Sequence, residues 1–363
     1  MCGRRTAIGR HLEYLAANWS RRATPFDRIV FMTPRPVAVD GLGTGSRIEF
    51  RAIGGSLPPL VWEQVALPAA ARGAAVLFSE YTCPLLRRDA TVVANHGIYE
   101  AVPEAFSRWH RFRATTVNRR SARHATRVIA NSTSTKSDLV RFFGVEPDRI
   151  DVVYPGPADV FFQTHDAAER SAAVIAALGA EVPFVIFVGK LATRRHVPNL
   201  IEAFSLVRLA HGLPHHLLLV GPNVNRLPLA ELAARFGVAD RVRHVEHMEQ
   251  EQLATLYAAA DLYALPSTYE GISWTMFEAM ASGTAVLTVE HPALHEGAAG
   301  SVFVLPDPTV PSLVNGLSTL LLDPSRRAQL AAAGRERAAE FSLARSAEAT
   351  LEILDRVAPA RDR

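Results

Sequence analysis

The sequence predicts an α/β protein built from two Rossmann-like, doubly wound parallel-sheet domains that face a central cleft. Its 363 residues are too many for one typical domain and suit two. Short apolar segments alternate with longer segments of helical periodicity, as in consecutive βαβ units. Polar residues and glycines follow several apolar segments, where a parallel sheet presents ligands. We expect residues 1–157 to form the first domain, residues 158–342 the second, and a C-terminal helix over 343–363 to pack back on the first.

Composition narrows the class of protein. Hydrophobic residues make up 48% and charged residues 21% of the chain, which is typical of a globular protein with a core. The formal net charge is only +3, so local clusters of charge matter more than the total. Two cysteines, Cys2 and Cys83, are too few for a disulfide framework and favour a reducing compartment. Neither a signal peptide nor a run of about 18 apolar residues is recognisable, so we expect a cytoplasmic protein.

The first half combines short strands with helices. Apolar residues at helical spacing predict a helix over 6–20, and prolines bound a second helix over 57–68. The short apolar segments predict strands over 28–32, 46–53, 75–79, 91–95, 127–130 and 150–153. A further helix is expected over 136–143, with Thr135 and Asp138 forming a start that resembles a capping box.

The second half repeats this alternation after a linker at 154–157. Strands are predicted over 184–188, 216–220, 242–244, 262–265, 285–289 and 302–305. Helices are predicted over 199–209, 229–236, 249–259, 311–322, 326–341 and 343–357. Residues suited to ligands follow strands in both halves: His96, Ser132, Gly189, Arg194, Arg195, Gly221, Glu270, Glu278, His295 and Glu296. The glycine-rich segment 41–45 lacks the following helix of a dinucleotide-binding motif, so we expect a turn there.

The segment 264–287 carries the most specific pattern. A strand over 262–265 leads into a loop with Glu270 and Gly271, and a helix with Glu278 follows, so seven residues separate the two carboxylates. The start of that helix offers backbone N–H groups and a positive dipole end, which favour an anion. Carboxylates suit the hydroxyl groups of a sugar or a ribose. The pattern therefore predicts a ligand that carries both phosphate and hydroxyl groups.

A basic segment over 106–127 stands apart from these motifs. Arginines and histidines alternate with apolar residues there, and the basic patch that we predict consists of Arg111, Arg113, Arg119 and Arg120. One interpretation is a solvated basic helix, and the other is attraction to anionic lipid headgroups or to a phosphorylated acceptor. No recognised nucleic-acid-binding module surrounds the segment, so we expect no nucleic-acid partner.

Several ordered segments resemble one enzyme family. The loop and helix described above end in Glu-Ala-Met-Ala-Ser-Gly and resemble the E-x7-E signature of retaining glycosyltransferases with the two-domain GT-B fold, specifically family 4. Segment 187–204, FVGKLATRRHVPNLIEAF, is similar to the family's V-G-x-L-x-x-R-K-N-L-x-x-L-I-E-A-F. Segments 240–267 and 128–156 are similar to further family segments, so the resemblance covers most of residues 57–310.

The resemblance implies transfer of a sugar from a nucleoside-diphosphate sugar to an acceptor hydroxyl, with retention of the anomeric configuration. Arg194 and Arg195 take the places that hold the pyrophosphate of the sugar donor. Glu278 is implied to bind the ribose hydroxyls and Glu270 the hydroxyls of the transferred sugar. His96 is implied to contact that sugar, with its backbone carbonyl steadying the positive charge of the transition state.

Further site residues follow from the same resemblance. On the sugar-donor side they are Gly189, Gly221, Gly271, Ile272 and Ser273, and on the acceptor side they are Gly9, Ser132 and Lys136. Residues 6–12 resemble the family's G-I-G-R-Y loop and helix, although Ala7 replaces the first glycine and only about five residues precede it where relatives have a strand. His196 stands where the family has asparagine, and the sequence suggests no role for it.

Substrates and partners are expectations of the same kind. The pattern looks most like mannosyltransferases of bacterial surface-polysaccharide assembly, which implies GDP-mannose as the first candidate donor and UDP-sugars as the second. The acceptor is expected to be a saccharide or a lipid-linked saccharide, and the basic patch adds an expected contact with the inner face of the cell membrane. Members of the group generally need no metal, and the sequence has no Asp-x-Asp pair, so we expect no metal and no cofactor.

Three alternatives stay open. A sugar-nucleotide-binding or lipid-binding protein on the same scaffold would have lost catalysis, and the presence of both arginines and both glutamates argues against it. A sugar-nucleotide epimerase shares the fold but needs a general acid/base set that the sequence does not supply. A phosphorylase usually needs a pyridoxal lysine, and the only lysines, Lys136 and Lys190, lie in no such context.

Overall fold

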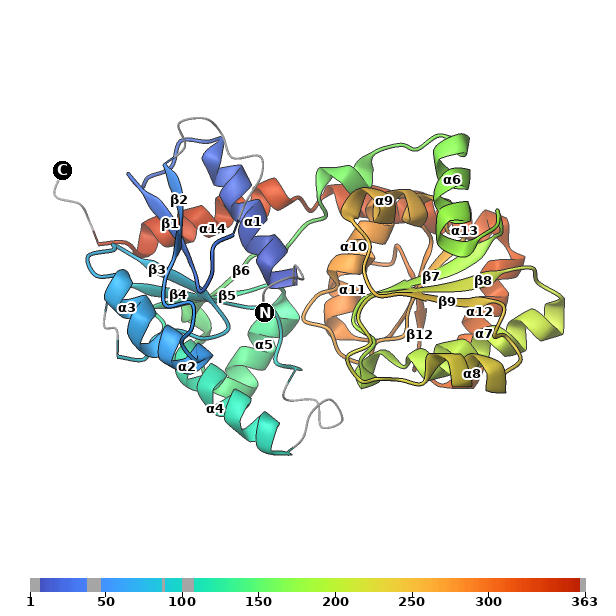
Figure 1. Ribbon diagram of the computed structural model, residues 1–363, viewed down its shortest axis with the longest axis horizontal. Coiled ribbons are helices and arrows are strands. Elements are labelled where there is room, and N and C mark those ends of the chain that lie inside the picture. Colours follow the sequence, from blue (N-terminus) through green and yellow to red (C-terminus); the bar gives the residue numbers. More distant parts are fainter. Residues whose placement is uncertain (1–6, 38–46, 87–88, 100–107, 360–363) are drawn as a thin grey trace. The chain divides into compact units, whose positions relative to one another are not determined.

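The computed structural model of the chain describes residues 7–37, 47–86, 89–99 and 108–359. The predicted turn at 41–45 lies outside the described residues. The chain forms two compact units (Figure 1). The first contains the described residues up to Tyr154 and from Leu343 onward, and the second contains Pro155–Ser342.

The first unit is organised around a four-stranded parallel sheet with the order β3-β4-β5-β6. Its strands are β3 (Leu77–Glu80), β4 (Thr91–Asn95), β5 (Arg127–Ala130) and β6 (Ile150–Val152). Alternate residues of a strand face opposite sides of the sheet. Accordingly, Val93 packs in one apolar cluster, and Val92 and Ala94 pack in another. Burial on both faces explains why these strands read as continuous apolar segments in the sequence.

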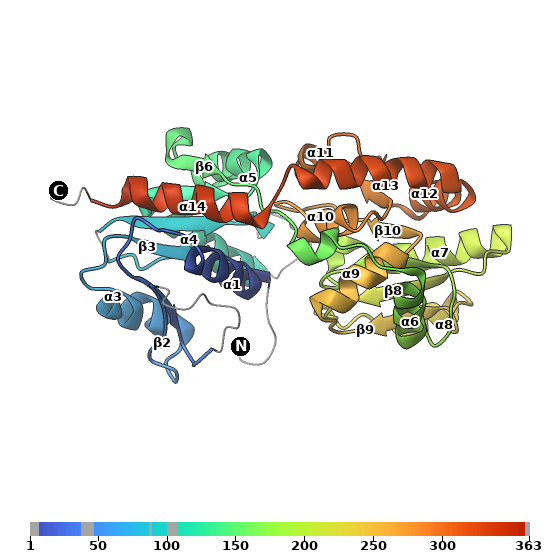
Figure 2. The ribbon, with the colours of Figure 1, turned by 90° about the horizontal axis from the view of Figure 1, so that it is seen from above.

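Helices cover both faces of this sheet. They are α1 (Ala7–Ser20), α4 (Arg108–His124), α5 (Thr133–Asp138), the π-helical turn η3 (Leu139–Phe143) and α14 (Leu343–Val357). Ala122 of α4 packs in the cluster of Val93, whereas α1 and α14 cover the other face. There the Trp19 indole donates to the Ala347 carbonyl oxygen at 2.9 Å, and Arg356 pairs with Asp151 of β6 at 2.7 Å. The last helix of the chain therefore packs on the first unit (Figure 2).

Two strands of the first unit lie outside its main sheet. β1 (Ile29–Thr33) and β2 (Ile48–Ala52) pair with each other in a separate two-stranded parallel sheet. The predicted parallel sheet of the first half is present, but this pair of strands does not join it. Ile29, Phe31 and Ile48 pack against the apolar cluster of α1 and α14, but both strands stay only partly buried.

A helical segment in three pieces confirms the predicted helix over 57–68. The pieces are α2 (Pro59–Val61), the π-helical turn η1 (Trp62–Ala66) and α3 (Leu67–Ala70). The indole of Trp62 donates to the Ile53 carbonyl oxygen at 2.6 Å. The segment is thereby fixed to the chain that follows β2. Elsewhere in this unit, a short 3-10 turn, η4 (Pro147–Arg149), directly precedes β6.

The second unit contains a six-stranded parallel sheet with the order β12-β11-β10-β7-β8-β9. The strands are β7 (Phe184–Val188), β8 (His216–Val220), β9 (Val242–Val245), β10 (Leu262–Leu265), β11 (Val286–Val289) and β12 (Phe303–Leu305). The first of these in the chain, β7, lies in the middle of the sheet. The chain adds β8 and β9 on one side of β7 and β10 to β12 on the other, so β7 and β10 flank the topological switch point.

The helices of the second unit form two packed groups, as a doubly wound sheet requires. The helical segments are η5 (Asp159–Phe162), α6 (Ala167–Leu178), η6 (Thr193–Arg195), α7 (Val197–His211), α8 (Leu229–Arg235), α9 (Gln250–Ala259), α10 (Trp274–Ala281), α11 (Pro292–Ala298), α12 (Val310–Leu322) and α13 (Pro324–Ala339). α7 packs against α8 and α12, whereas α9 and α10 pack together and against α6 and α13. None of the described helices combines the length and apolarity needed to cross a membrane.

Two helices of this unit were not predicted. α6 begins with a capping box formed by Asp166 and Glu169 and ends at Gly179, so its start and stop signals were present in the sequence. α11 lies in the segment after β11 that carries His295 and Glu296, where the sequence pattern predicts a loop rather than a helix, so that prediction is wrong. Its start is fixed by His291, whose Nδ1 accepts from the Ala293 N–H at 3.3 Å, with Pro292 at the first helical position.

Candidate sugar-donor site

The candidate site of the second unit lies at the carboxyl ends of three neighbouring strands. Gly189 follows β7, Gly221 follows β8, and the loop with Glu270 follows β10. Arg194 and Arg195 lie in η6, between β7 and α7. The topological switch point therefore brings together residues that are far apart in the sequence.

A buried carboxylate holds both arginines. Glu270 is 2% exposed, and its Oε1 lies 3.0 Å from Arg195 Nη2 and 3.4 Å from Arg194 Nη1. The Ser267 hydroxyl donates to the same oxygen at 2.8 Å. These contacts place two guanidinium groups and one carboxylate in a small polar cluster, which we call the arginine–glutamate cluster.

The charges in this cluster control one another. Burial opposes ionisation of Glu270, but Arg194 and Arg195 outweigh it and lower the pKa of the carboxyl below its usual value. Desolvation and the positive charges of the same two arginines lower the pKa of Lys190. The cationic surroundings favour an anion, so a phosphate group that approached this loop would meet positive charge already held in place.

Two glycines allow the arginine–glutamate cluster to pack closely. Gly189 has φ +136° and Gly221 has φ +131°, a region that favours glycine. A Cβ on Gly189 would lie 1.7 Å from Arg195 Nη1, and a Cβ on Gly221 would lie 2.2 Å from the Gly189 carbonyl oxygen. Arg195 Nη1 donates to the Val188 carbonyl oxygen at 3.2 Å. Glycine at 189 lets the Arg195 guanidinium lie over the end of β7, and glycine at 221 lets two loops touch.

His196, for which the sequence suggests no role, fixes the loop of the arginines. Its backbone is left-handed, with φ +44° and ψ +37°, at the residue that caps α7. Asparagine and histidine are enriched in this conformation, which accounts for the asparagine usual in the family. His196 Nε2 lies 3.4 Å from Thr268 Oγ1, and the Thr268 N–H donates to the Arg194 carbonyl oxygen at 2.9 Å. The loop after β10 is thereby joined to the loop after β7.

The helix start that the sequence predicts for an anion is α10. Gly271, Ile272 and Ser273 directly precede it, and the Ser273 Oγ caps it by accepting from the Met276 N–H at 3.2 Å. Glu278 lies within the helix and is 5% exposed. Gly271, Ile272 and Ser273 thus follow Glu270 of the arginine–glutamate cluster directly in the sequence. Glu278 lies further along, buried within the helix.

In the first unit, His96 directly follows β4, as predicted. Its Nε2 lies 2.6 Å from Glu80 Oε2, and its backbone carbonyl oxygen accepts from Asn131 Nδ2 at 3.3 Å. Asn131 follows the neighbouring strand β5, so parallel pairing places it beside His96. The backbone carbonyl that the resemblance implies as a charge stabiliser is thus held by an amide that the sequence reasoning missed.

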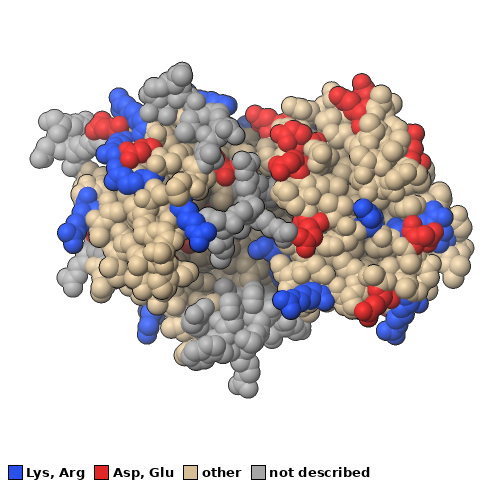
Figure 3. Space-filling model, in the orientation of Figure 1, with Lys and Arg blue, Asp and Glu red and all other residues tan. Residues whose placement is uncertain are grey.

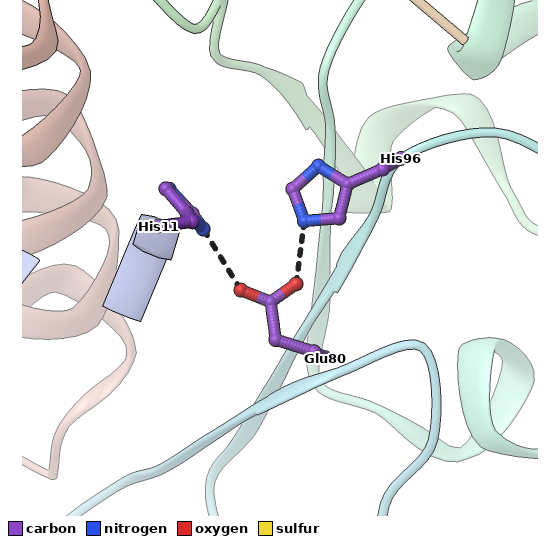
Figure 4. Close-up of side chains that lie close together, drawn as sticks. All are labelled: His11, Glu80 and His96. Carbon is purple, nitrogen blue, oxygen red and sulfur yellow. Dashed lines mark hydrogen bonds and ion pairs between the residues drawn. The ribbon is translucent and has the colours of Figure 1, made fainter. Parts of the chain in front are cut away.

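The sequence reasoning also missed His11 and Glu80. The other Glu80 oxygen, Oε1, lies 2.9 Å from His11 Nδ1 (Figure 4). Among the residues that the structure describes, these two and His96 form one group with ligand atoms close enough for a metal ion, all within 4.8 Å. The signal was available, because Glu80 ends β3, the strand next to β4, and His11 stands at the tyrosine of the G-I-G-R-Y pattern.

The predicted acceptor-side residues take structural positions in the first unit. Gly9 lies in α1. Ser132 caps α5 by accepting from the Thr135 N–H at 2.9 Å, so the helix begins before Thr135 and the predicted start is wrong. Lys136 Nζ donates to the Ile150 carbonyl oxygen at 3.0 Å and thus joins α5 to β6.

The predicted basic patch is partly described. Arg111 and Arg113 lie in α4, but their side chains are outside the described residues. Arg119 and Arg120 are exposed, and Arg119 Nε donates to the Phe143 carbonyl oxygen at 3.3 Å. On the face seen in Figure 3, basic and acidic side chains are interspersed. The hydrogen bond from Arg119 to Phe143 gives this arginine a structural role, which agrees with the interpretation of a solvated basic helix.

The other predicted polar residues of the second unit, His295 and Glu296, lie in α11. The His295 side chain is 65% exposed, and its Nδ1 lies 3.9 Å from Glu290 Oε1. Neither the exposure of His295 nor its ion pair with Glu290 links these residues to the arginine–glutamate cluster, and we assign them no part in the site.

Comparison with known proteins agrees with this architecture. A family model described as "Glycosyl transferases group 1" matches residues 173–337, and one described as "Glycosyltransferase Family 4" matches residues 8–157. A structure of Anabaena Alr3699/HepE in complex with UDP-glucose superimposes with a TM-score of 0.78 at 19% identity, covering 98% of both chains. A glycosyltransferase from Rickettsia africae superimposes with a TM-score of 0.72 at 15% identity, covering 96% of this chain and 94% of that one.

Curated relatives point the same way. A D-inositol 3-phosphate glycosyltransferase of Nocardia farcinica is 34% identical over 238 residues, covering 63% of this chain and 52% of the relative. An MMP alpha-(1->4)-mannosyltransferase of Mycolicibacterium hassiacum is 31% identical over 254 residues, covering 69% and 58%. The matches span about half the length of these relatives. The two family models together span most of the chain, and both units have the predicted parallel sheets. The chain therefore belongs to the family 4 glycosyltransferases with the GT-B fold.

Proposed function

We propose that this protein transfers a sugar from a nucleoside-diphosphate sugar to a hydroxyl of a saccharide or lipid-linked saccharide acceptor. The observation that carries the proposal is the arginine–glutamate cluster at the switch point of the second unit. Two fixed guanidinium groups suit a diphosphate, and a carboxylate suits sugar hydroxyls. The contacts of Arg194 and Arg195 with Glu270 support the proposal, because they bring the two guanidinium groups and the carboxylate together.

The difficult step of such a reaction is departure of the diphosphate while positive charge builds on the sugar. Arg194 and Arg195 offset the growing negative charge of the leaving group, and the start of α10 adds its dipole. Preorganised hydrogen-bond donors of this kind are worth roughly 3–4 kcal/mol each in the transition state. When the diphosphate takes over the arginines, Glu270 is released to accept hydrogen bonds from the sugar. We propose retention of configuration, no resident metal or cofactor, and a role for Glu278 at the ribose.

The identity of the sugar and acceptor is the finer part of the proposal. GDP-mannose remains the first candidate donor, supported by the mannosyltransferase among the relatives. UDP-sugars are the second, supported by the UDP-glucose complex of a protein with the same fold. The relatives named for D-inositol 3-phosphate support a phosphorylated acceptor as one member of the test panel. A role for the protein in bacterial surface-polysaccharide assembly would account for a saccharide acceptor.

Thermal stabilisation by nucleotides tests the donor site. We expect GDP, UDP or one of their sugars, at about one hundred times its Kd, to add about 2.7 kcal/mol to the free energy of unfolding. Arg194→Ala should weaken the affinity roughly 10–100-fold, because hydrogen bonds to charged groups contribute about 1.5–3 kcal/mol each. Arg235→Ala removes an exposed arginine of α8 and should leave the nucleotide effect unchanged.

Turnover of the same nucleotide sugar separates the alternatives. Transfer to an acceptor, with a product of the same anomeric configuration, supports the proposal. Stabilisation without turnover would favour a catalytically inactive binding protein, and a changed sugar configuration in the nucleotide sugar would favour an epimerase. A folded protein that no nucleotide stabilises would contradict the proposal itself.

We also propose peripheral contact of α4 with an anionic membrane on the cytoplasmic side. The exposed side chains of Arg119 and Arg120 support it, together with Arg111 and Arg113 of the same helix. Changing all four to glutamine should reduce co-sedimentation with anionic liposomes, because each basic residue near such a surface contributes about 1 kcal/mol. Neutral liposomes are the control. Unchanged binding to anionic liposomes would refute the membrane contact.

A further inference from the structure

A buried carboxylate in the first unit is shared by two histidines from different elements. Glu80 ends β3, His11 lies in α1 and His96 follows β4. The side chains of Glu80 and His11 are each 8% exposed, and that of His96 is 15% exposed. Each carboxylate oxygen serves one imidazole, at 2.9 Å for His11 and 2.6 Å for His96 (Figure 4). The carboxylate is therefore held at both oxygens.

The backbone beside this group is in an uncommon conformation. Tyr81, directly after Glu80, has φ +63°, which is rare for a bulky residue. The Tyr81 N–H donates to the Ala94 carbonyl oxygen at 2.8 Å, and its ring lies 5.7 Å from that of His96 at an angle of 63°. Such conformations cost of order 1–3 kcal/mol and cluster at functional sites. The turn after Glu80 thus holds both the carboxylate and a ring against His96.

The protonation of the carboxylate decides which nitrogens carry protons. Burial opposes ionisation of Glu80, but His96 and His11 outweigh it and lower the pKa of this carboxyl to about 2. An ionised carboxylate only accepts hydrogen bonds. His11 must then donate through Nδ1 and His96 through Nε2. The Nδ1 of His96 lies on the opposite edge of the ring from Glu80 (Figure 4).

We propose that Glu80 is a positioning residue for His96, which it holds in one ring orientation with Nε2–H toward the carboxylate and Nδ1 directed away from it. His11 is the second anchor, since it holds the other oxygen and prevents rotation of the carboxylate. The inference rests on the proposed function and on the role that the family resemblance implies for His96, contact with the transferred sugar. A carboxylate that fixes the tautomer and orientation of a functional histidine is a recurrent arrangement in enzymes.

Substitution by glutamine challenges this arrangement without changing its size. The amide of Glu80→Gln has one acceptor oxygen and one donor nitrogen, so it cannot accept from both imidazoles. One histidine must lose its bond or exchange its tautomer. We expect kcat for sugar transfer to fall roughly 10–100-fold, as for other residues that orient a functional histidine, with a smaller change in KM for the sugar donor. His11→Gln, which leaves the bond between Glu80 and His96 in place, should have a smaller effect.

A double-mutant cycle distinguishes positioning from a general structural role. If Glu80 acts through His96, Glu80→Gln should lower activity in the wild-type background and cause little further loss in the His96→Ala background. Glu63→Gln is the matched control, because Glu63 is a partly buried carboxylate of the same unit that accepts from Thr82 Oγ1 at 2.6 Å. Equal losses from Glu80→Gln in both backgrounds would overturn the proposal.

The imidazole tautomers provide a readout that needs no turnover. Nitrogen NMR of histidine-labelled protein at pH 8 should find Nε2 protonated in His96 and Nδ1 protonated in His11, the form less common in free histidine. His11 protonated at Nε2 instead would overturn the proposal. A wild-type protein with the expected tautomers but no activity on any nucleotide sugar would refute the proposed function. The orientation of His96 by Glu80 would still be supported.

Metal binding is the competing explanation of the same three side chains. One equivalent of Zn²⁺ should leave the thermal stability of the wild-type protein unchanged, because hydrogen bonds already occupy both carboxylate oxygens. Stabilisation by Zn²⁺ that Glu80→Gln abolishes would assign the group to a metal site with two histidines and one carboxylate, and would overturn the positioning role. If Glu80→Gln does not fold, the imidazole tautomers of the wild-type protein decide the proposal by themselves.

Discussion

Glu270→Ala is expected to abolish measurable sugar transfer and to lower the free energy of unfolding by roughly 3–5 kcal/mol. The reason is that the carboxylate holds two guanidinium groups whose side chains are only 11% and 10% exposed. Removing it leaves these positive charges buried without their shared anion. Chemical denaturation measures the stability, and an assay with the nucleotide sugar measures the transfer.

Controls for this prediction come from the same unit. Glu231→Ala removes an exposed carboxylate of α8 and should change stability by less than about 0.5 kcal/mol. A bound nucleoside diphosphate should restore part of the stability lost in Glu270→Ala, because its phosphates replace the missing negative charge. A variant as stable and as active as the wild type would contradict the role of the arginine–glutamate cluster.

Acid should weaken the wild-type protein through the same carboxyl. The pKa of Glu270 is lower in the folded protein than in the unfolded chain, so the folded state binds fewer protons. Its contribution to stability is present above the unfolded pKa of about 4.3 and is lost as the pH falls through the folded value. In Glu270→Gln this part of the acid dependence should disappear.

Gly221→Ala is the second substitution with a large expected effect. We expect the free energy of unfolding to fall by roughly 2–6 kcal/mol, from backbone strain and overpacking of about 1–3 kcal/mol each. The residue has φ +131°, and a Cβ would lie 2.2 Å from the Gly189 carbonyl oxygen and 2.7 Å from its carbonyl carbon. Both atoms belong to the backbone after β7, so neither can rotate away as a side chain would.

Gly237→Ala separates strain from contact. Gly237 has φ +71°, and a Cβ there would meet nothing within 4 Å, so only the conformational cost remains. That cost is roughly 1–2 kcal/mol. The excess loss in Gly221→Ala reports the close approach of the loops after β7 and β8 together with the greater strain at φ +131°. Similar losses in the two variants would show that this approach is looser than described.

Local pattern was enough to predict most elements of the chain. β4, β5, β7, β8 and β10 have the predicted bounds, because a strand buried on both faces is a short apolar run between polar or turn residues. The strand-to-loop positions of His96, Arg194 and Glu270 followed from the same reading. The separation of β1 and β2 from the main sheet was not predicted, because the sequence pattern of a parallel strand does not depend on which strand it pairs with.

Sequence pattern alone predicts the alternation of strands and helices, the family, and which residues follow the carboxyl ends of strands. These properties are local, since periodicity and motif spacing depend on neighbours along the chain. The fold is needed to see that Glu270 pairs with both arginines, that Gly189 makes room for Arg195, and that Glu80 lies between His11 and His96. His11 and Glu80, for example, are 69 positions apart in the chain, and tertiary packing, which no local pattern encodes, brings them together.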